Sequence, residues 1–364
     1  MTQKQIVILC GILGVLALGI FLKSWIRSAG DSAEAARAGR VAFSEFDSAK
    51  LERILIGRPA KTGGSQTPAV ELTKENGVWK VKSLWSAQAD PVKVEALIRE
   101  IRSAQGELRG SGKKLFEDFG IQEGEAFSIQ LFGAKDASLL DFRVGTKQAG
   151  ENVYFIRKAS SENIYLVEMN LAELLGIFTD FKEAKPDSLF WADRSLFNLD
   201  PEKVTRITVD HVKNRVKTMT AGFGLVKDPN DPAKNSWIFL QRADRSYTLD
   251  PEKVLRFIAT LNSVKAQKVV DPAGKDYGLE NPDWEIAVTE GGTETILSIS
   301  GKNEKEKGCF VKISRNPGVF ILGATYTEDL EVDDARFAKE ASKEAALGAK
   351  LSKSSPQSPV EQTS

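Results

Sequence analysis

Short runs in which apolar and polar residues alternate recur along most of the chain, separated by Gly, Asn, Asp or Pro. Alternation with a period of two is typical of strands that turn one face to the core and the other to water. These runs therefore predict antiparallel strands joined by tight connections. In the first half of the chain they are LERILIG, AVELTKEN, GVWKVK, FSIQLFG, LLDFRVG, NVYFIRK and NIYLVE.

Two segments change from this alternation to helical spacing. Asp90 and Asp250 are each followed by proline, the pattern of an N-cap residue and a first helical position. The apolar residues behind them recur at i, i+3, i+4 and i+7, which predicts two amphipathic helices with one buried stripe each. These residues are Val94, Leu97, Ile98 and Ile101, and Val254, Phe257, Ile258 and Leu261. A shorter helix is expected at residues 170–178.

The same series of motifs occurs twice in the same order, which indicates an internal repeat. Small differences in spacing between the two series are typical of insertions in loops. The matching segments are 46–54 and 199–207, Trp79 and Trp237, Asp90 and Asp250, 118–121 and 276–279, and 153–157 and 309–313.

The expected fold class is α+β, with two tandem copies of an antiparallel-sheet-plus-helix module after one N-terminal transmembrane helix. A chain of 364 residues is long enough for two such cores. The expected parts are an anchor at 1–27, a linker at 28–42, the modules at 43–185 and 186–337, and a tail at 338–364. The tail is rich in Ala, Lys, Ser and Pro and is predicted to be disordered.

The anchor is predicted from an uncharged run between Ile6 and Leu22. As a helix this run would span roughly 26 Å, close to the thickness of a hydrocarbon core. A cleaved signal peptide is the alternative, although Lys23, Trp25 and Arg27 interrupt the place where its cleavage site would lie. The Ala-rich stretch at 32–38 keeps that alternative open. We expect a single pass through a bacterial inner membrane, with the residues after Arg27 in the periplasm.

Composition narrows the classes of partner. Lys plus Arg and Asp plus Glu both number 50, and like charges form only short runs, so nucleic acid is not an expected partner. The two cysteines, Cys10 and Cys309, provide neither a disulfide framework nor a thiolate metal site.

Three motifs resemble catalytic signatures without completing them. His211 is the single histidine, so we expect a surface strand position and not a metal site or a catalytic triad. Asp118-Phe119-Gly120 matches a kinase triplet but recurs as a repeated turn, and residues 110–114 lack the required glycine and hydroxyl of a phosphate loop. Those residues are expected to form a flexible connector. No catalytic residue, cofactor, cofactor-binding residue or metal ligand is assigned, and no enzyme is expected.

The repeated residues resemble the bacterial family of unknown function called DUF4340, over roughly 43–330. Trp237, Asp250, the turn Tyr277-Gly278-Leu279 and Phe310 carry the resemblance. Members of this family are similar to proteins found beside ABC-type export systems of the gliding-motility kind, and many have one N-terminal membrane helix. The resemblance therefore implies a non-enzymatic accessory subunit that contacts an ABC-type permease, its ATPase and associated extracytoplasmic subunits.

Two further hypotheses stay open on the sequence. Abundant Asp and Glu would allow an envelope hydrolase that uses two carboxylates in a deep cleft. A polysaccharide-binding module would need a row of exposed aromatic residues, whereas Trp79, Trp237 and Trp284 lie in strand-like runs and are expected in the core.

Overall fold

The computed structural model describes residues 40–42, 46–58, 70–178, 181–183, 185–231, 234–240, 248–274 and 276–339. The predicted anchor and nearly all of the predicted tail lie outside these residues. Among the described helices, none combines the length and the apolar character needed to cross a membrane. The described residues divide into two compact units, one within 1–79 and 91–191 and the other within 80–90 and 192–364.

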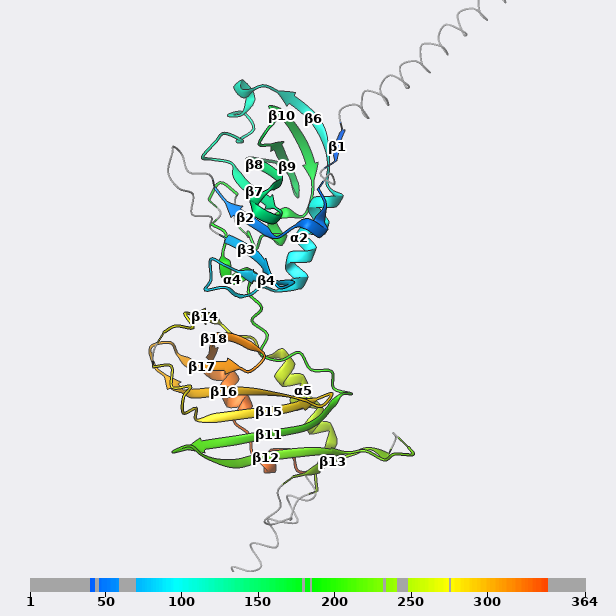
Figure 1. Cartoon of the computed structure of the whole chain (residues 1–364), viewed down its shortest axis with the longest axis vertical. Coiled ribbons are helices and arrows are strands. Elements are labelled where there is room, and N and C mark those ends of the chain that lie inside the picture. The colour runs from blue at the N-terminus through cyan, green and yellow to red at the C-terminus, as the bar shows by residue number, and fades with distance from the viewer. Residues whose placement is uncertain are drawn as a thin grey trace, which may run out of the picture. The chain divides into compact units, whose positions relative to one another are not determined.

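The first sheet has ten antiparallel strands in the part of the chain that the structure describes, in the order β1-β6-β10-β9-β8-β7-β2-β3-β4-β5 (Figure 1). Every run expected as a strand in the first half of the chain forms one. The bounds are β1 Arg40–Ala42, β2 Arg53–Gly57, β3 Val70–Glu75, β4 Val78–Val81, β5 Ala87–Gln88, β6 Gln105–Ser111, β7 Phe127–Phe132, β8 Ser138–Gly150, β9 Val153–Lys158 and β10 Asn163–Glu168.

The second sheet has eight strands among the described residues, in the order β13-β12-β11-β15-β16-β17-β18-β14. Its neighbouring strands again pair antiparallel, as in the hairpin of β11 and β12, where Val209 lies opposite Ala221. The bounds are β11 Val204–Lys213, β12 Val216–Val226, β13 Ser236–Phe239, β14 Lys268–Val270, β15 Trp284–Glu290, β16 Thr293–Asn303, β17 Gly308–Ile313 and β18 Asn316–Gly323.

The two sheets share one strand order. In the first sheet the run β6-β10-β9-β8-β7-β2-β3-β4 matches β14-β18-β17-β16-β15-β11-β12-β13 in the second, strand for strand in chain order. The strands β1 and β5 are additions at the two edges of the first sheet. The equivalent strands β9 and β17 begin at Val153 and Gly308. The alignment of 153–157 with 309–313 that was predicted from the sequence was therefore wrong by one residue. A shift of one residue exchanges the two faces of a strand.

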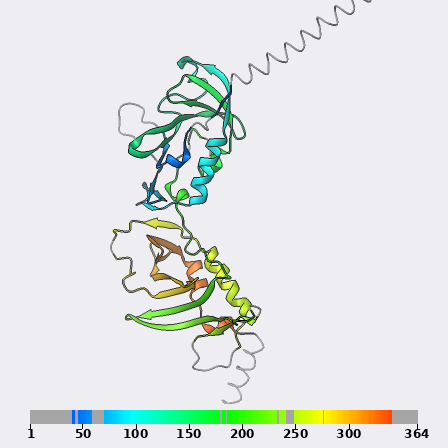
Figure 2. The ribbon, with the colours of Figure 1, turned by 45° about the vertical axis from the view of Figure 1, so that its right-hand side comes forward.

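Helices are few, so the described structure is mostly β, more so than the expected α+β class suggests. The two long helices are α2, Pro91–Ser103, and α5, Pro251–Ser263, and both begin at the predicted proline. Asp250 caps α5 by accepting a hydrogen bond from the Glu252 N–H at 3.1 Å. The buried stripes are Val94, Leu97 and Ile101 on α2 and Val254, Phe257, Ile258 and Leu261 on α5. Each helix lies against its own sheet (Figure 2).

The shorter helices are α3, Leu171–Leu174, α4, Ser188–Trp191, and α6, Ala324–Leu330. The prediction of a helix at 170–178 was therefore too long. Gly176 adopts a φ of +66°, the left-handed conformation that ends helices. Short 3-10 turns occupy Ser48–Lys50, Lys113–Leu115, Ala134–Asp136 and Asp334–Phe337.

The repeated turns contain a glycine with positive φ in both sheets, +65° at Gly120 and +72° at Gly278. At Gly120 an added Cβ would lie 2.5 Å from the Thr146 Oγ1 and 3.0 Å from the Lys147 amide nitrogen. The turn therefore needs glycine for both its backbone conformation and its close approach to β8. The expectation that this triplet is a structural turn is confirmed.

Gly120→Ala is expected to lower the free energy of unfolding by about 2–4 kcal/mol, because the left-handed backbone and the overpacked contact both carry a cost. Gly77→Ala is the matched control, since Gly77 has a φ of +82° but nothing within 4 Å of the added Cβ. The control should lose only about 1–2 kcal/mol. Urea denaturation measures both variants, and equal losses would contradict the close approach.

Candidate functional site

Two arginines face each other on the first sheet, where Arg143 of β8 pairs directly with Arg157 of β9. Their side chains are only 9% and 3% exposed. Like charges in such a cross-strand pair repel each other, and burial adds a desolvation cost to each cation. The pair therefore requires anions and hydrogen-bond acceptors around it.

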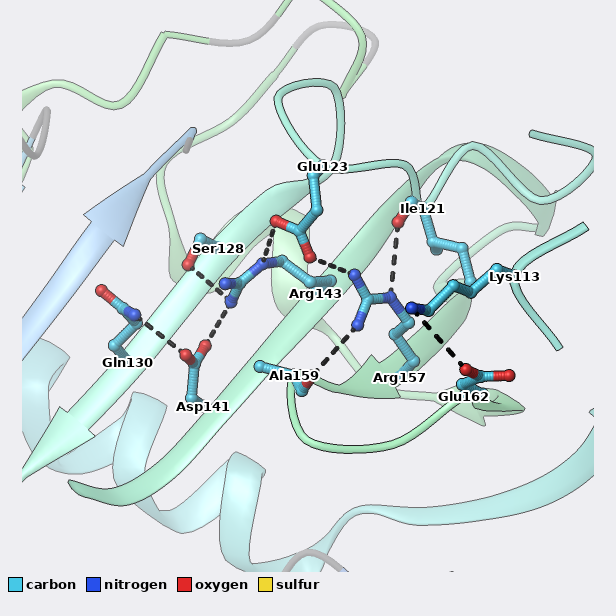
Figure 3. Close-up of polar contacts among 10 residues, drawn as sticks. All are labelled: Lys113, Ile121, Glu123, Ser128, Gln130, Asp141, Arg143, Arg157, Ala159 and Glu162. Carbon is cyan, nitrogen blue, oxygen red and sulfur yellow. Dashed lines mark hydrogen bonds and ion pairs between the residues drawn. The ribbon is translucent and has the colours of Figure 1, made fainter. Parts of the chain in front are cut away.

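Glu123 supplies the bridging anion (Figure 3). The Arg143 Nε donates to Glu123 Oε2 at 3.4 Å, and the Arg157 Nη2 donates to Glu123 Oε1. Each carboxylate oxygen thus contacts a different arginine. The Glu123 side chain itself is 59% exposed, so water reaches this side chain although both arginines are buried.

The remaining contacts of Arg143 come from its own strand, β8, and from the neighbouring strand β7. Its Nη1 donates to the Ser128 Oγ at 3.0 Å and to the Asp141 carboxylate. Asp141 in turn accepts a hydrogen bond from the Gln130 Nε2 at 2.9 Å. Besides Glu123, two side chains therefore hold the guanidinium of Arg143 directly, and Gln130 holds one of them, Asp141.

Arg157 is held by the segment that precedes β7. Its Nε donates to the Ile121 carbonyl at 3.4 Å, and its Nη1 donates to the Ala159 carbonyl at 3.3 Å. The Phe116 ring lies beneath the guanidinium, 4.4 Å from its Cζ, in a cation–π contact. The segment 116–126, which we call the Glu123 loop, is thereby docked onto β9.

Two opposing effects set the pKa of Glu123. Burial raises the pKa, but the hydrogen bond from Arg157 and the charges of both arginines outweigh it and hold the pKa below the ordinary value of 4.5. A carboxyl group with a depressed pKa stabilises the folded state above its unfolded pKa, and this stabilisation is lost as pH falls through its folded pKa.

Glu123→Gln is therefore expected to lower stability by about 1 kcal/mol near neutral pH, a value reduced for the exposure of this carboxylate. The difference from the unmodified protein should begin to shrink below about pH 4.5 and vanish once the pH is below the depressed pKa of folded Glu123. Urea denaturation over this pH range measures the effect. Glu162→Gln is the matched control, because Glu162 is similarly exposed but lies 4.0 Å from Lys113 in a single surface ion pair. A pH-independent difference at Glu123 would contradict the charge interaction.

A second group of charges lies on the second sheet. Lys217 forms an ion pair with Glu285. The pKa of the neighbouring Asp210 is raised mainly by burial and also by the Glu285 charge, and the Lys217 charge opposes this rise. Near one end of this sheet, burial and the charges of Asp283 and Glu328 raise the pKa of Glu331. Within the described residues, no group of three or more His, Cys, Asp or Glu side chains is arranged to hold a metal ion.

His211 lies in β11 as expected, half-buried, with its ring 4.9 Å from that of Trp284. It lines an open surface hollow together with Lys213, Arg215 and Asp283. Glu331 interacts with two of these residues: the Asp283 charge raises the pKa of Glu331, and His211 lowers it. These carboxylates lie beside an open surface, whereas the hydrolase hypothesis requires a deep cleft.

The other residues singled out in the sequence are the tryptophans, Cys309 and the segment 110–114. Trp79 is 8% exposed and belongs to the core as expected, whereas the same expectation was wrong for Trp237 and Trp284, which are half-buried. Cys309 is a buried free thiol, and burial raises its pKa. The expectation of a flexible connector at 110–114 was wrong, because these residues complete β6 and begin the 3-10 turn Lys113–Leu115.

The fold and its polar cluster define a class: a mostly β protein with two antiparallel sheets of one strand order. The model of the family described as Domain of unknown function (DUF4340) matches residues 79–242 and 240–344. The chain therefore belongs to the DUF4340 family. The first match begins in β4 and the second just after the equivalent strand β13, so the matches follow the period of the repeat. No curated protein and no solved structure matches the chain.

Proposed function

We propose that this protein is a non-enzymatic, membrane-anchored accessory subunit of an ABC-type transport system. Its leading apolar segment crosses the bacterial inner membrane once. Its two units are tandem copies of one antiparallel-sheet-plus-helix module that bind a partner or a substrate in the periplasm. The permease and the ATPase of the transporter are the expected partners.

The observation that carries this proposal is the shared strand order of the two sheets. A duplicated scaffold on one chain offers two related surfaces, and linked binding surfaces raise the effective concentration of the second contact. The uncharged run from Ile6 to Leu22 supports the anchor, because it is long enough for a hydrocarbon core.

The proposal is tested by affinity capture of the full-length protein from membranes solubilised in mild detergent. The permease and the ATPase of one transport system should be recovered together with it. A control variant with residues 1–27 replaced by a cleavable signal peptide should leave the membrane fraction and lose both. Recovery of neither component would contradict the proposal.

Membrane orientation is tested separately in spheroplasts of the host. External protease should digest the region after Arg27 while the inner membrane is intact. Protection of the C-terminus from protease would contradict the periplasmic assignment.

A further inference from the structure

The second sheet shows that this fold forms without the arginine pair of Arg143 and Arg157. Ile129 pairs with Phe142 in the first sheet as Ile286 pairs with Leu297 in the second, which fixes the register between the two. The positions equivalent to the arginine pair are then Ser298 and Lys312, which lie opposite each other. Lys312 is exposed.

The repeated turn also keeps its packing in both sheets. Phe119 packs on Phe155 with ring centroids 4.5 Å apart, and Tyr277 packs on Phe310 at 4.7 Å. Three residues after the turn glycine, however, the first sheet has Glu123 and the second has Asn281, which accepts a hydrogen bond from Arg215. The turn and the strand order therefore do not account for two buried arginines.

The arginine pair is held in place independently of Glu123. Ser128 and Asp141 fix Arg143, while the Ile121 and Ala159 carbonyls fix Arg157. If the Glu123 side chain swings away, both guanidinium groups keep these partners and their positions. Fixed donors of this kind make a binding site that needs little rearrangement.

The net charge of the arginine pair with Asp141, and the exposure of Glu123 to water, indicate which ligand the site can bind. Two arginines and Asp141 leave a single positive charge, which one carboxylate balances, whereas a phosphate dianion would leave an excess negative charge in a buried site. The two oxygens of Glu123 meet one arginine each, and this side chain is 59% exposed although the guanidinium groups are buried. An incoming carboxylate can therefore approach from water as Glu123 leaves into water.

We propose that the arginine pair is a carboxylate-binding site, occupied at rest by Glu123, that exchanges this internal ligand for an acidic side chain of a partner polypeptide. Guanidinium groups recognise carboxylates through directed, charge-assisted hydrogen bonds. That the incoming carboxylate belongs to a polypeptide rests on the proposed binding function. The assignment of the arginine pair as a carboxylate site does not rest on it.

The site is tested first in full-length Glu123→Ala, where acetate replaces the missing carboxylate. In calorimetric titrations, acetate should bind Glu123→Ala at least tenfold more tightly than the unmodified protein, because the internal competitor is absent. Asn281→Ala, the equivalent change in the second sheet, should bind acetate no more tightly than the unmodified protein does. Glu123→Gln, which keeps the size of the side chain, replaces Glu123→Ala if the alanine variant does not fold.

Exchange is then tested in the unmodified full-length protein with the tripeptide acetyl-Gly-Glu-Gly-amide and its Gln counterpart. The ¹³C resonance of the Glu123 carboxyl group is assigned by its loss in Glu123→Gln. On addition of the Glu tripeptide this resonance should move toward the position of a free glutamate, whereas the Gln tripeptide should leave it in place. The tripeptide is added to the unmodified protein at a concentration that saturates the Glu123→Ala variant. If the Glu123 resonance is unchanged there, exchange is overturned and Glu123 stays bound to the arginine pair.

Failure of folded Glu123→Ala to bind acetate would overturn the site itself. Binding of sulfate or inorganic phosphate more tightly than acetate would overturn the assignment to carboxylates. These outcomes do not depend on the capture of a transporter, so the site can stand if the proposed function fails, and the reverse also holds.

Discussion

Replacing Arg157 with alanine is expected to lower the free energy of unfolding of the first unit by about 3–5 kcal/mol. The change removes the hydrogen bonds to Glu123, Ile121 and Ala159 together with the contact on the Phe116 ring. Because these partners tie the Glu123 loop to β9, the loop should also open. Urea denaturation of the full-length protein measures the loss, and amide hydrogen exchange across 116–126 reports the opening.

Lys312→Ala is the matched control for this change, since Lys312 occupies the equivalent strand position but is exposed. Its stability should stay within about 0.5 kcal/mol of the unmodified protein. A small effect at Arg157, comparable to that at Lys312, would mean that the buried arginine contributes no more than a surface charge.

Replacing Phe337 with alanine is expected to lower the free energy of unfolding of the second unit by about 3–5 kcal/mol. Phe337 is 2% exposed and packs between Phe223 of β12 and Phe257 of α5, with ring centroids 4.3 and 5.4 Å away. Asp334 adds to this contact by accepting a hydrogen bond from the Gly222 N–H at 3.2 Å. The segment after α6 thus joins the sheet to its helix.

Tyr326→Ala serves as the comparison, because Tyr326 is 39% exposed on α6 and should lose less than about 1 kcal/mol. Thermal unfolding followed by circular dichroism distinguishes the two variants. A Phe337 variant as stable as the Tyr326 variant would show that the segment after α6 contributes little to the core.

Much of the sheet architecture was predictable from local pattern. Alternating runs such as that around Ile54 and Ile207 become strands because one face of each is buried, and both residues are fully buried. The helix α5 was predicted from Asp250 and Pro251 because capping chemistry is local in sequence. Because the sequence repeats, an element predicted in one half of the chain supported the prediction of its counterpart in the other half.

Elements without strong periodicity were not predictable. The strand β6 buries only one of its seven residues, Gly106, so its sequence gives no alternation to detect. By contrast, the short length of α3 had a local signal in Gly176, whose left-handed conformation ends helices.

The arginine pair was missed for a different reason. In a strand, Arg143 lies between Phe142 and Val144 and is expected to face water by the period of two. Its burial arises because the Glu123 loop covers that outer face, a tertiary contact between segments far apart in sequence. Both strands also contain other charged residues, Asp141 in β8 and Lys158 in β9, so the local pattern gave no signal that the arginines are buried.

In each sheet, one interior strand pair joins segments that lie far apart along the chain. β2 pairs with β7 and β11 pairs with β15, although a helix and several strands separate the partners along the chain. The hairpins of β8, β9 and β10 close locally, whereas the central pair must close a long loop, which slows folding. A nascent chain that ends before Phe127 lacks β7 and presents the unpaired edge of β2. We therefore expect each unit to be most prone to aggregate during synthesis, until its later strands pair with the earlier ones.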